Sequence, residues 1–100
     1  MPLKRMKKLN TSECLWIYVL KILSDSPAHG YSLRELVRQR FGFRPGTVTA
    51  YKVLYLLGRR GYVSKRTDGR KKVYSLTPKG RKALKEAAAF YRELADKLDS

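Results

Sequence analysis

The sequence of 100 residues predicts a mainly α-helical fold with one small β-hairpin, which places it in the α+β class. Apolar residues recur with the 3.6-residue period of a helix in three stretches before residue 61. The period then changes to two over residues 62–76, and a last helical stripe follows from residue 78. Three helices, a hairpin and a helix in this order predict a winged helix-turn-helix with an extended C-terminal dimerisation helix.

We divide the chain into three parts. Residues 1–10 are a basic N-terminal arm, which we expect to be loose at its start. Residues 11–77 would form the winged helix-turn-helix, and residues 78–100 the dimerisation helix.

The first predicted helix begins at a cap formed by Thr11 or Ser12 and ends near Leu23. It is apolar almost all round, and its β-branched residues leave a strand as an alternative. As a helix it turns Ile17 and Leu20 away from the face that builds the core. That second face is too apolar for water, so we expect another chain to cover it.

The second predicted helix covers residues 32–40, with Ser32 and Glu35 at the spacing of a capping box and Arg34 facing outward. The third begins near Thr47 or Thr49. It is stopped by the glycine at position 61.

Asp68 and Gly69 join the two strands, and this pair predicts a type I′ turn with both central residues at positive φ. Thr77 followed by Pro78 is typical of a helix start. The helix that follows carries a heptad-like apolar stripe at alternating steps of three and four residues. Together with the second face of the first helix it gives the candidate dimer interface: Ile17, Leu20, Leu84, Ala87, Tyr91, Leu94 and Leu98.

The charge balance is extreme, with 23 Lys and Arg against 8 Asp and Glu, a net charge of +15. Such a charge attracts polyanions, so nucleic acid is the first candidate partner and an anionic membrane the rival. Between residues 59 and 82 ten basic residues face one acid, Asp68. We interpret them as a phosphate-binding wing, the alternative being a surface that only keeps the protein soluble.

The small number of cysteine and histidine residues argues against several function classes. Cys14 and His29 are the only residues of their kinds, so we expect no disulfide, no zinc site, no other metal or cofactor, and no His-dependent catalytic triad. The chain is therefore not expected to be an enzyme, and we expect His29 to hydrogen bond locally. We also expect neither a membrane-spanning segment nor a secretion signal.

Three stretches of the chain resemble the PadR-like family of transcriptional regulators, from about residue 15 to residue 84. They are Pro27-Ala28-His29-Gly30-Tyr31 with Leu33, then Thr49-Ala50-Tyr51 continuing through Leu54 and Leu57 to Gly61-Tyr62-Val63, and Gly69-Arg70-Lys71-Lys72-Val73-Tyr74-Ser75-Leu76-Thr77-Pro78-Lys79-Gly80. The resemblance implies a homodimer that binds operator DNA. It places the third helix, about residues 47–60, in the major groove and the wing, residues 62–76, on the phosphate backbone.

The chain departs from the family pattern at Val48, where glycine is usual, and at Lys52, where proline is common. Arg59 and Arg60 stand where acidic residues are common. These changes favour stronger and less discriminating binding to the DNA backbone.

The candidate DNA-binding residues are hydrogen-bond donors and cations on the second and third helices and on the hairpin. They are Ser32, Arg34, Thr47, Thr49, Tyr51, Lys52, Tyr55, Arg59, Lys65, Arg66, Arg70, Lys71 and Lys72. Tyr31 is left open between the core and a phosphate contact.

The function predicted from the sequence is a DNA-binding transcriptional regulator whose partners are double-stranded DNA and a second copy of itself. The alternatives are a sequence-tolerant chromatin or RNA-associated protein and a protein-interaction module of a transcription complex. The sequence predicts no membrane partner. It gives no sign of a small-molecule effector, but it does not exclude one. We expect a cytoplasmic, nucleoid-associated location in a prokaryote, and the presence of only two amide residues, Asn10 and Gln39, hints at a thermophilic source.

Overall fold

The computed structural model of the chain describes residues 2–11 and 14–100, so the predicted cap at Ser12 lies outside the described residues. The fold class is confirmed, with helices forming most of the chain and a small antiparallel sheet. The elements are α1 (Pro2–Leu9), α2 (Leu15–Asp25), β1 (Ala28–His29), the 3₁₀ helix η1 (Gly30–Ser32), α3 (Leu33–Phe41), α4 (Thr47–Arg59), β2 (Val63–Asp68), β3 (Lys71–Leu76) and α5 (Pro78–Asp99).

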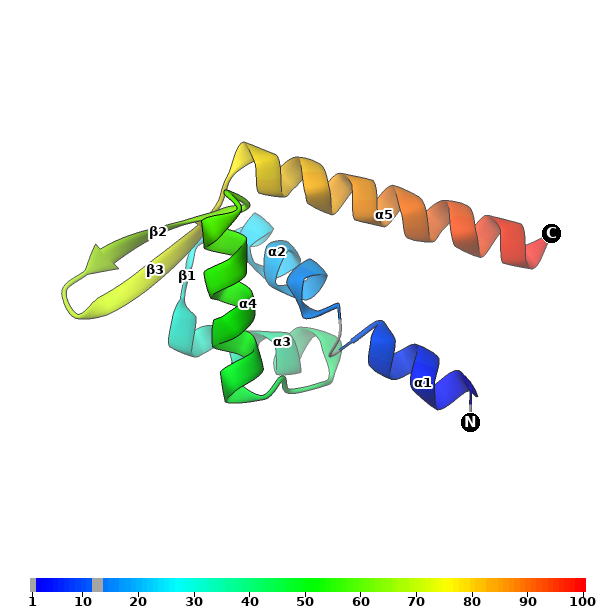
Figure 1. The fold of residues 1–100 in the computed structure, drawn as a ribbon, viewed down its shortest axis with the longest axis horizontal. Helices are drawn as coiled ribbons and strands as arrows, with labels where there is room; N and C mark the ends of the chain where they lie inside the picture. The colour runs from blue at the N-terminus through cyan, green and yellow to red at the C-terminus, as the bar shows by residue number, and fades with distance from the viewer. Residues whose placement is uncertain (1, 12–13) are drawn as a thin grey trace.

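The molecule is elongated, with a longest dimension of 52 Å. α2, α3 and α4 form its body, and the β2–β3 hairpin projects from one side of that body (Figure 1). α5 begins beside the base of the hairpin and runs past α2, so that its C-terminal end lies with α1 on the side opposite the hairpin (Figure 1). The tip of the hairpin and the two chain termini are therefore at opposite ends of the molecule (Figure 1).

The core is built around α2. Leu15 and Val19 are buried on one side of this helix, as its 3.6-residue period predicts. Leu20, on the other side, is completely buried as well. The prediction that Leu20 contacts a second subunit is therefore wrong, because α3, α4, α5 and β3 of the same chain pack around α2.

The first ten residues differ from the prediction. Pro2–Leu9 forms helix α1 instead of a loose arm, and α2 begins only at Leu15. The Thr11 hydroxyl does not cap α2; it donates to the carbonyl of Lys7 at the end of α1, 2.8 Å away. Thr11 therefore belongs to the end of the preceding helix.

The sheet has three strands in the order β1-β3-β2, all antiparallel. β1 is only two residues long, which is too short for its period to be visible in the sequence. The hairpin turn lies one residue later than predicted, because Asp68 pairs with Lys71 and leaves Gly69 and Arg70 as the central residues. Of these two only Gly69 has a positive φ, which is the sign pattern of a type II′ turn and not of type I′.

The predicted capping box at the start of α3 is absent. Ser32 makes no side-chain cap hydrogen bond, and Glu35 instead accepts from Arg38 one turn later. That interaction with Arg38 is the main reason why the pKa of Glu35 lies below its usual value.

The start of α5 is as predicted. The Thr77 hydroxyl accepts a hydrogen bond from the amide of Gly80 at 3.0 Å, and Pro78 follows in the first turn. The helix has 22 residues. Neither α5 nor any other helix in the described ranges is long and apolar enough to cross a lipid bilayer.

Candidate nucleic-acid interface

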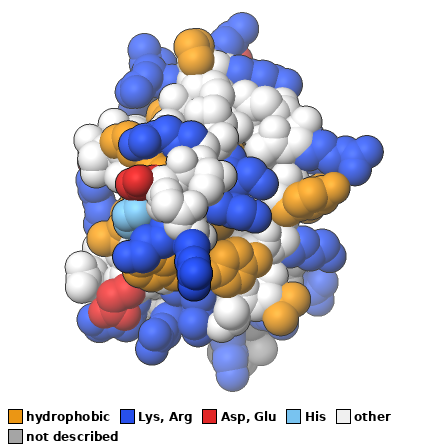
Figure 2. Space-filling model, turned by 90° about the vertical axis from the view of Figure 1, so that its left-hand side faces the viewer, with side chains coloured by type: hydrophobic (Ala, Val, Ile, Leu, Met, Phe, Trp, Pro, Cys, Tyr) orange, Lys and Arg blue, Asp and Glu red, His pale blue; other side chains and the backbone are white. Residues whose placement is uncertain are grey.

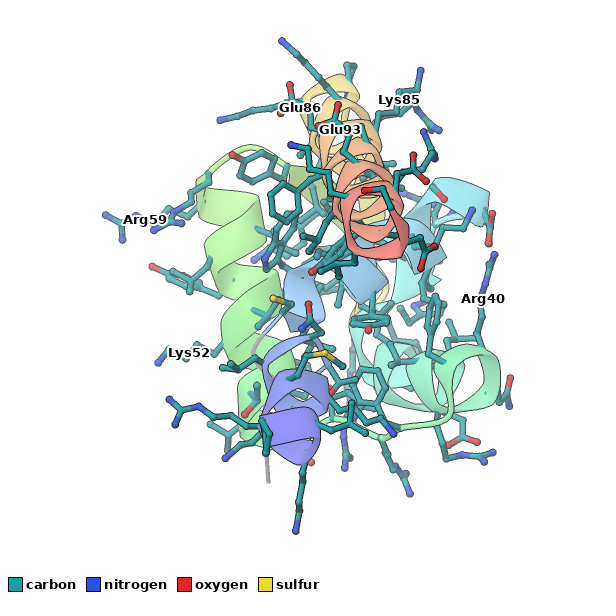
Figure 3. All side chains as sticks on the ribbon, turned by 90° about the vertical axis from the view of Figure 1, so that its right-hand side faces the viewer. Arg40, Lys52, Arg59, Lys85, Glu86 and Glu93 are labelled. Atoms are coloured by element: carbon teal, nitrogen blue, oxygen red, sulfur yellow. The ribbon has the colours of Figure 1, made fainter. Side chains whose placement is uncertain are left out.

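The outer side of α4 presents polar and cationic side chains to solvent. Lys52 and Arg59 project from the same side of this helix, away from Glu86 and Glu93 on α5 (Figure 3). Tyr55 is 63% exposed between them, and Arg59 donates from Nη1 to its hydroxyl at 3.4 Å. The predicted boundaries of this helix are confirmed by the structure, and the three residues are all exposed.

The first turn of α4 is also open to solvent. Thr47 and Thr49 are exposed, and the residue that precedes the helix, Gly46, has no side chain with which to cap it. The first amide groups of a helix lack partners within it and carry its positive dipole end. This end of α4 is thus suited to a phosphate oxygen.

A groove of about 610 Å³ lies between α4 and the hairpin. Tyr55 and Arg59 line it from α4, and Lys65 and Lys72 line it from the strands. Tyr74 also lines it and is only 8% exposed, as expected for a core residue. Burial, with a smaller effect of Tyr51, raises the pKa of the Tyr74 phenol, so its ring contributes no charge to this groove at neutral pH.

The strand register divides the hairpin cations between two faces. Lys65 pairs with Tyr74 and Thr67 with Lys72, so Lys65 and Lys72 share the face that lines the groove. Arg66 pairs with Val73, and its side chain therefore points to the opposite face. Lys71, two residues before Val73, shares that face, while Arg70 lies in the exposed turn.

An aromatic and cationic cluster lies at the edge of the sheet. The Tyr31 ring stacks on His29 with centroids 5.3 Å apart, and the Lys71 ammonium lies 5.4 Å from the Tyr31 centroid. Tyr31 is 58% exposed, so it is not a core residue. The prediction that His29 hydrogen bonds locally is not met at Nδ1, which is buried without a hydrogen-bond partner among the described residues.

The ion pairs of the described residues lie on another part of the surface. Asp25 pairs with Lys21 and Arg40, and Glu35 pairs with Arg38, all on α2 and α3. Within residues 2–11 and 14–100, no ion pair includes a cation of α4 or the hairpin. The hairpin end of the molecule carries many Lys and Arg side chains and few acidic ones (Figure 2). Its positive charge is therefore available to a polyanion.

Three predicted contact residues lie nearer the body. Arg34 is half-buried, and its Nε donates to the carbonyl of Pro45 at 2.8 Å. The prediction that Arg34 faces outward is therefore met only in part, because its Nε is bonded to the loop before α4. Ser32 is half-buried at the end of η1, and Tyr51 is 46% exposed.

The candidate dimer residues of α5 fall into two groups. Leu84 and Ala87 are half-buried, with Leu84 packed on the core. Farther along the helix Tyr91, Leu94 and Leu98 are exposed, Leu98 by 76%.

A cleft of about 690 Å³ lies between α1, α2 and α5 and is lined by Ile17, Tyr91 and Leu94. Its α1 wall includes Met6, which is exposed together with Leu3 and Leu9. These three α1 residues are not among the predicted interface residues, although their spacing of three along the sequence is a signal of a shared helix face.

Comparison with known proteins gives one family match. The model of the transcriptional regulator PadR-like family matches residues 19–86, which include α3, α4 and the whole hairpin.

Among curated proteins, the chain is 32% identical over 81 residues to an uncharacterized 37.1 kDa protein in transposon TN4556 of Streptomyces fradiae. The match covers 80% of this chain but 24% of that protein, so the chain spans about a quarter of its relative's length.

Solved structures of other proteins share the fold. A PadR-like transcription factor from Bacteroides fragilis superposes with a TM-score of 0.80 at 21% identity, covering 95% of this chain and 96% of the other. F93 from STIV, a winged-helix DNA-binding protein, superposes with a TM-score of 0.72 at 20% identity, covering 87% of this chain and 91% of the other. The predicted winged-helix fold is confirmed.

Proposed function

The chain belongs to the PadR-like family of transcriptional regulators, and on that premise we propose that it binds operator sites in duplex DNA as a homodimer. Proteins of this family are DNA-binding transcription regulators rather than enzymes. The observation that carries the proposal is the groove between α4 and the hairpin, whose cations have no acidic partner among the described residues.

The phosphate backbone would lie along this groove. Lys65 and Lys72 reach it from the hairpin and Arg59 from α4, so cations from both elements can neutralise adjacent phosphates. Contacts of this kind supply most of the affinity and fix the position of the protein on the duplex, but they carry no sequence information.

Sequence would be read by α4 in the major groove. Lys52 and Tyr55 are exposed on its outer side and carry donors suited to base edges. Thr47 and Thr49, in the first turn, would bind the phosphates that flank the groove. Arg66, Arg70 and Lys71 would extend the phosphate contacts beyond the groove.

A second copy of the chain would cover the exposed apolar side of α5. Tyr91, Leu94 and Leu98 continue the stripe that Leu84 and Ala87 begin, and apolar side chains in a continuous row are costly to leave in water. Ile17 and the cleft beside it are continuous with this stripe through Tyr91 and Leu94. Two-fold pairing of such a surface gives two α4 helices for two half-sites.

One observation favours a second candidate function, that of a sequence-tolerant architectural protein. The net charge of +15 exceeds what solubility requires, and backbone contacts bind all sequences alike. Both functions place the protein in the cytoplasm, on the nucleoid.

Genome-wide occupancy of the protein in its own cells separates the two. Occupancy at a few sharp sites with a shared sequence supports the regulator. A broad distribution that follows DNA content contradicts it and supports the architectural protein.

A further inference from the structure

The end of α4 is joined to the start of α5 by hydrogen bonds on both sides of the junction. The Thr77 hydroxyl donates to the carbonyl of Gly61 at 2.7 Å, and the Thr77 amide donates to the carbonyl of Tyr62 at 3.2 Å. The Lys79 ammonium donates to the carbonyl of Arg60 at 2.7 Å. Three consecutive carbonyls after α4 are thus held by the first residues of α5.

The same segments also approach each other closely. Gly80 is buried, and a Cβ at this position would overlap the carbonyl oxygen of Tyr62 and lie 2.6 Å from Cδ1 of Leu76. The Lys79 ammonium lies 4.6 Å from the centre of the Tyr62 ring. We call these two segments, residues 60–62 and 77–80, the α4–α5 joint.

From these contacts we propose that the α4–α5 joint sets the distance between the two α4 helices of a dimer, and therefore the half-site spacing that the dimer accepts. Thr77, Lys79 and Gly80 are then positioning residues that act through α4. The inference rests on the proposed dimer, in which α5 is the helix that meets its partner.

Because α5 is long, a small change in its direction at the joint produces a large displacement of its far end. With 22 residues, α5 is about 33 Å long at 1.5 Å per residue, so a tilt of about 10° at the joint moves its far end by about 6 Å. In the proposed dimer the far ends of the two α5 helices are fixed against each other. The same tilt at the joint would then move α4 and the hairpin of one subunit relative to α4 and the hairpin of its partner.

Two variants disturb the joint in different ways, and each has a matched control. Lys79→Met removes the hydrogen bond to Arg60 and keeps the aliphatic stem, while Lys82→Met removes the same charge from an exposed position three residues later. Gly80→Ala places a methyl group against Tyr62. Gly58→Ala places one on α4, where its nearest neighbour is a Val63 methyl group 3.9 Å away.

The distance between the two α4 helices is measured by double electron–electron resonance. A spin label is attached at Val48→Cys, which is 81% exposed in the first turn of α4, in a Cys14→Ser background. We expect one narrow distribution for the parent and both controls, and a shifted or broadened distribution for Lys79→Met and Gly80→Ala. If Gly80→Ala does not fold, the distance distribution of Lys79→Met alone tests the proposal.

The second readout is binding to duplexes that carry two copies of the selected half-site at a series of spacings. We expect both joint variants to lose the parent's preference for one spacing. The affinity of Lys79→Met for a single half-site should match that of its charge control Lys82→Met, and the affinity of Gly80→Ala should match that of the parent. Suppose that the labelled parent is a dimer, and that the joint variants keep both its distance between the α4 helices and its preferred half-site spacing. This inference is then overturned, and the proposed function stands. A monomeric parent would overturn the proposed dimer and this inference with it.

Discussion

Arg34 on α3 donates from Nε to the main-chain carbonyl of Pro45, 2.8 Å away, and so ties α3 to the loop that precedes α4. Pro45 itself is buried. The loop has no regular structure of its own, and this bond is the side-chain tie that fixes it just before the first turn of α4. The start of the helix that would enter the major groove is therefore positioned by a residue of its neighbour.

We expect Arg34→Ala to lower the free energy of unfolding by about 1 to 2 kcal/mol, because it leaves the buried Pro45 carbonyl without its charged donor. Chemical denaturation measures this change. Arg38→Ala is the control, since Arg38 is exposed and its pairing with Glu35 is worth less than about 1 kcal/mol. Equal losses in the two variants would show that the bond to Pro45 contributes nothing specific.

A second prediction separates the two faces of the hairpin. Lys65→Ala with Lys72→Ala should weaken binding to every duplex sequence alike and lower the salt slope of binding by about 2, because two phosphate contacts are removed from the groove. Arg66→Ala with Lys71→Ala removes the same charge from the opposite face and should have the smaller effect. Fluorescence anisotropy at several salt concentrations gives both slopes. A larger effect of the second pair would contradict the prediction, because it would show that the DNA binds the hairpin face that carries Arg66 and Lys71.

A third prediction concerns sequence reading by α4. Lys52→Ala should cost about 1 to 3 kcal/mol on the preferred sequence and much less on unrelated DNA, because Lys52 would bind base edges. Arg59→Ala should weaken binding to both kinds of DNA by a similar factor, since Arg59 lines the backbone groove. Binding-site selection followed by titration tests this. A Lys52→Ala variant that keeps the parent's preference would contradict base reading by Lys52.

A fourth prediction concerns α5. Leu94→Asp with Leu98→Asp should give a folded monomer, because both residues are exposed within one chain and would be buried only against a partner. Sedimentation equilibrium measures the mass, and circular dichroism shows that the fold is kept. Arg92→Asp, on the same helix but outside the stripe, should remain a dimer. A double variant that still sediments as a dimer would rule out this side of α5 as the interface.

The elements that can be predicted from the sequence are those whose structure is determined by local chemistry. Thr77 followed by Pro78 caps α5 as predicted, and the apolar spacing of Ala50, Leu54 and Leu57 marks the buried side of α4. These signals succeed because a cap or a helical period involves residues close together in the chain.

The features that were predicted wrongly depend on contacts between residues that are distant in the sequence. An isolated helix as short as α1 is marginal in water, and here Asn10, just after it, accepts hydrogen bonds from Tyr18 and Tyr91. Leu20 looked like a contact residue because helical periodicity does not show that the same chain covers both sides of α2. The role of Arg34 likewise depends on Pro45, eleven residues away.

The most direct test of the account is the affinity of the protein for duplex DNA between 50 and 200 mM salt. If cations of α4 and the hairpin neutralise about six phosphates, the affinity should fall roughly a thousandfold across this range. An affinity that hardly changes with salt would contradict the central claim that this basic groove binds the phosphate backbone.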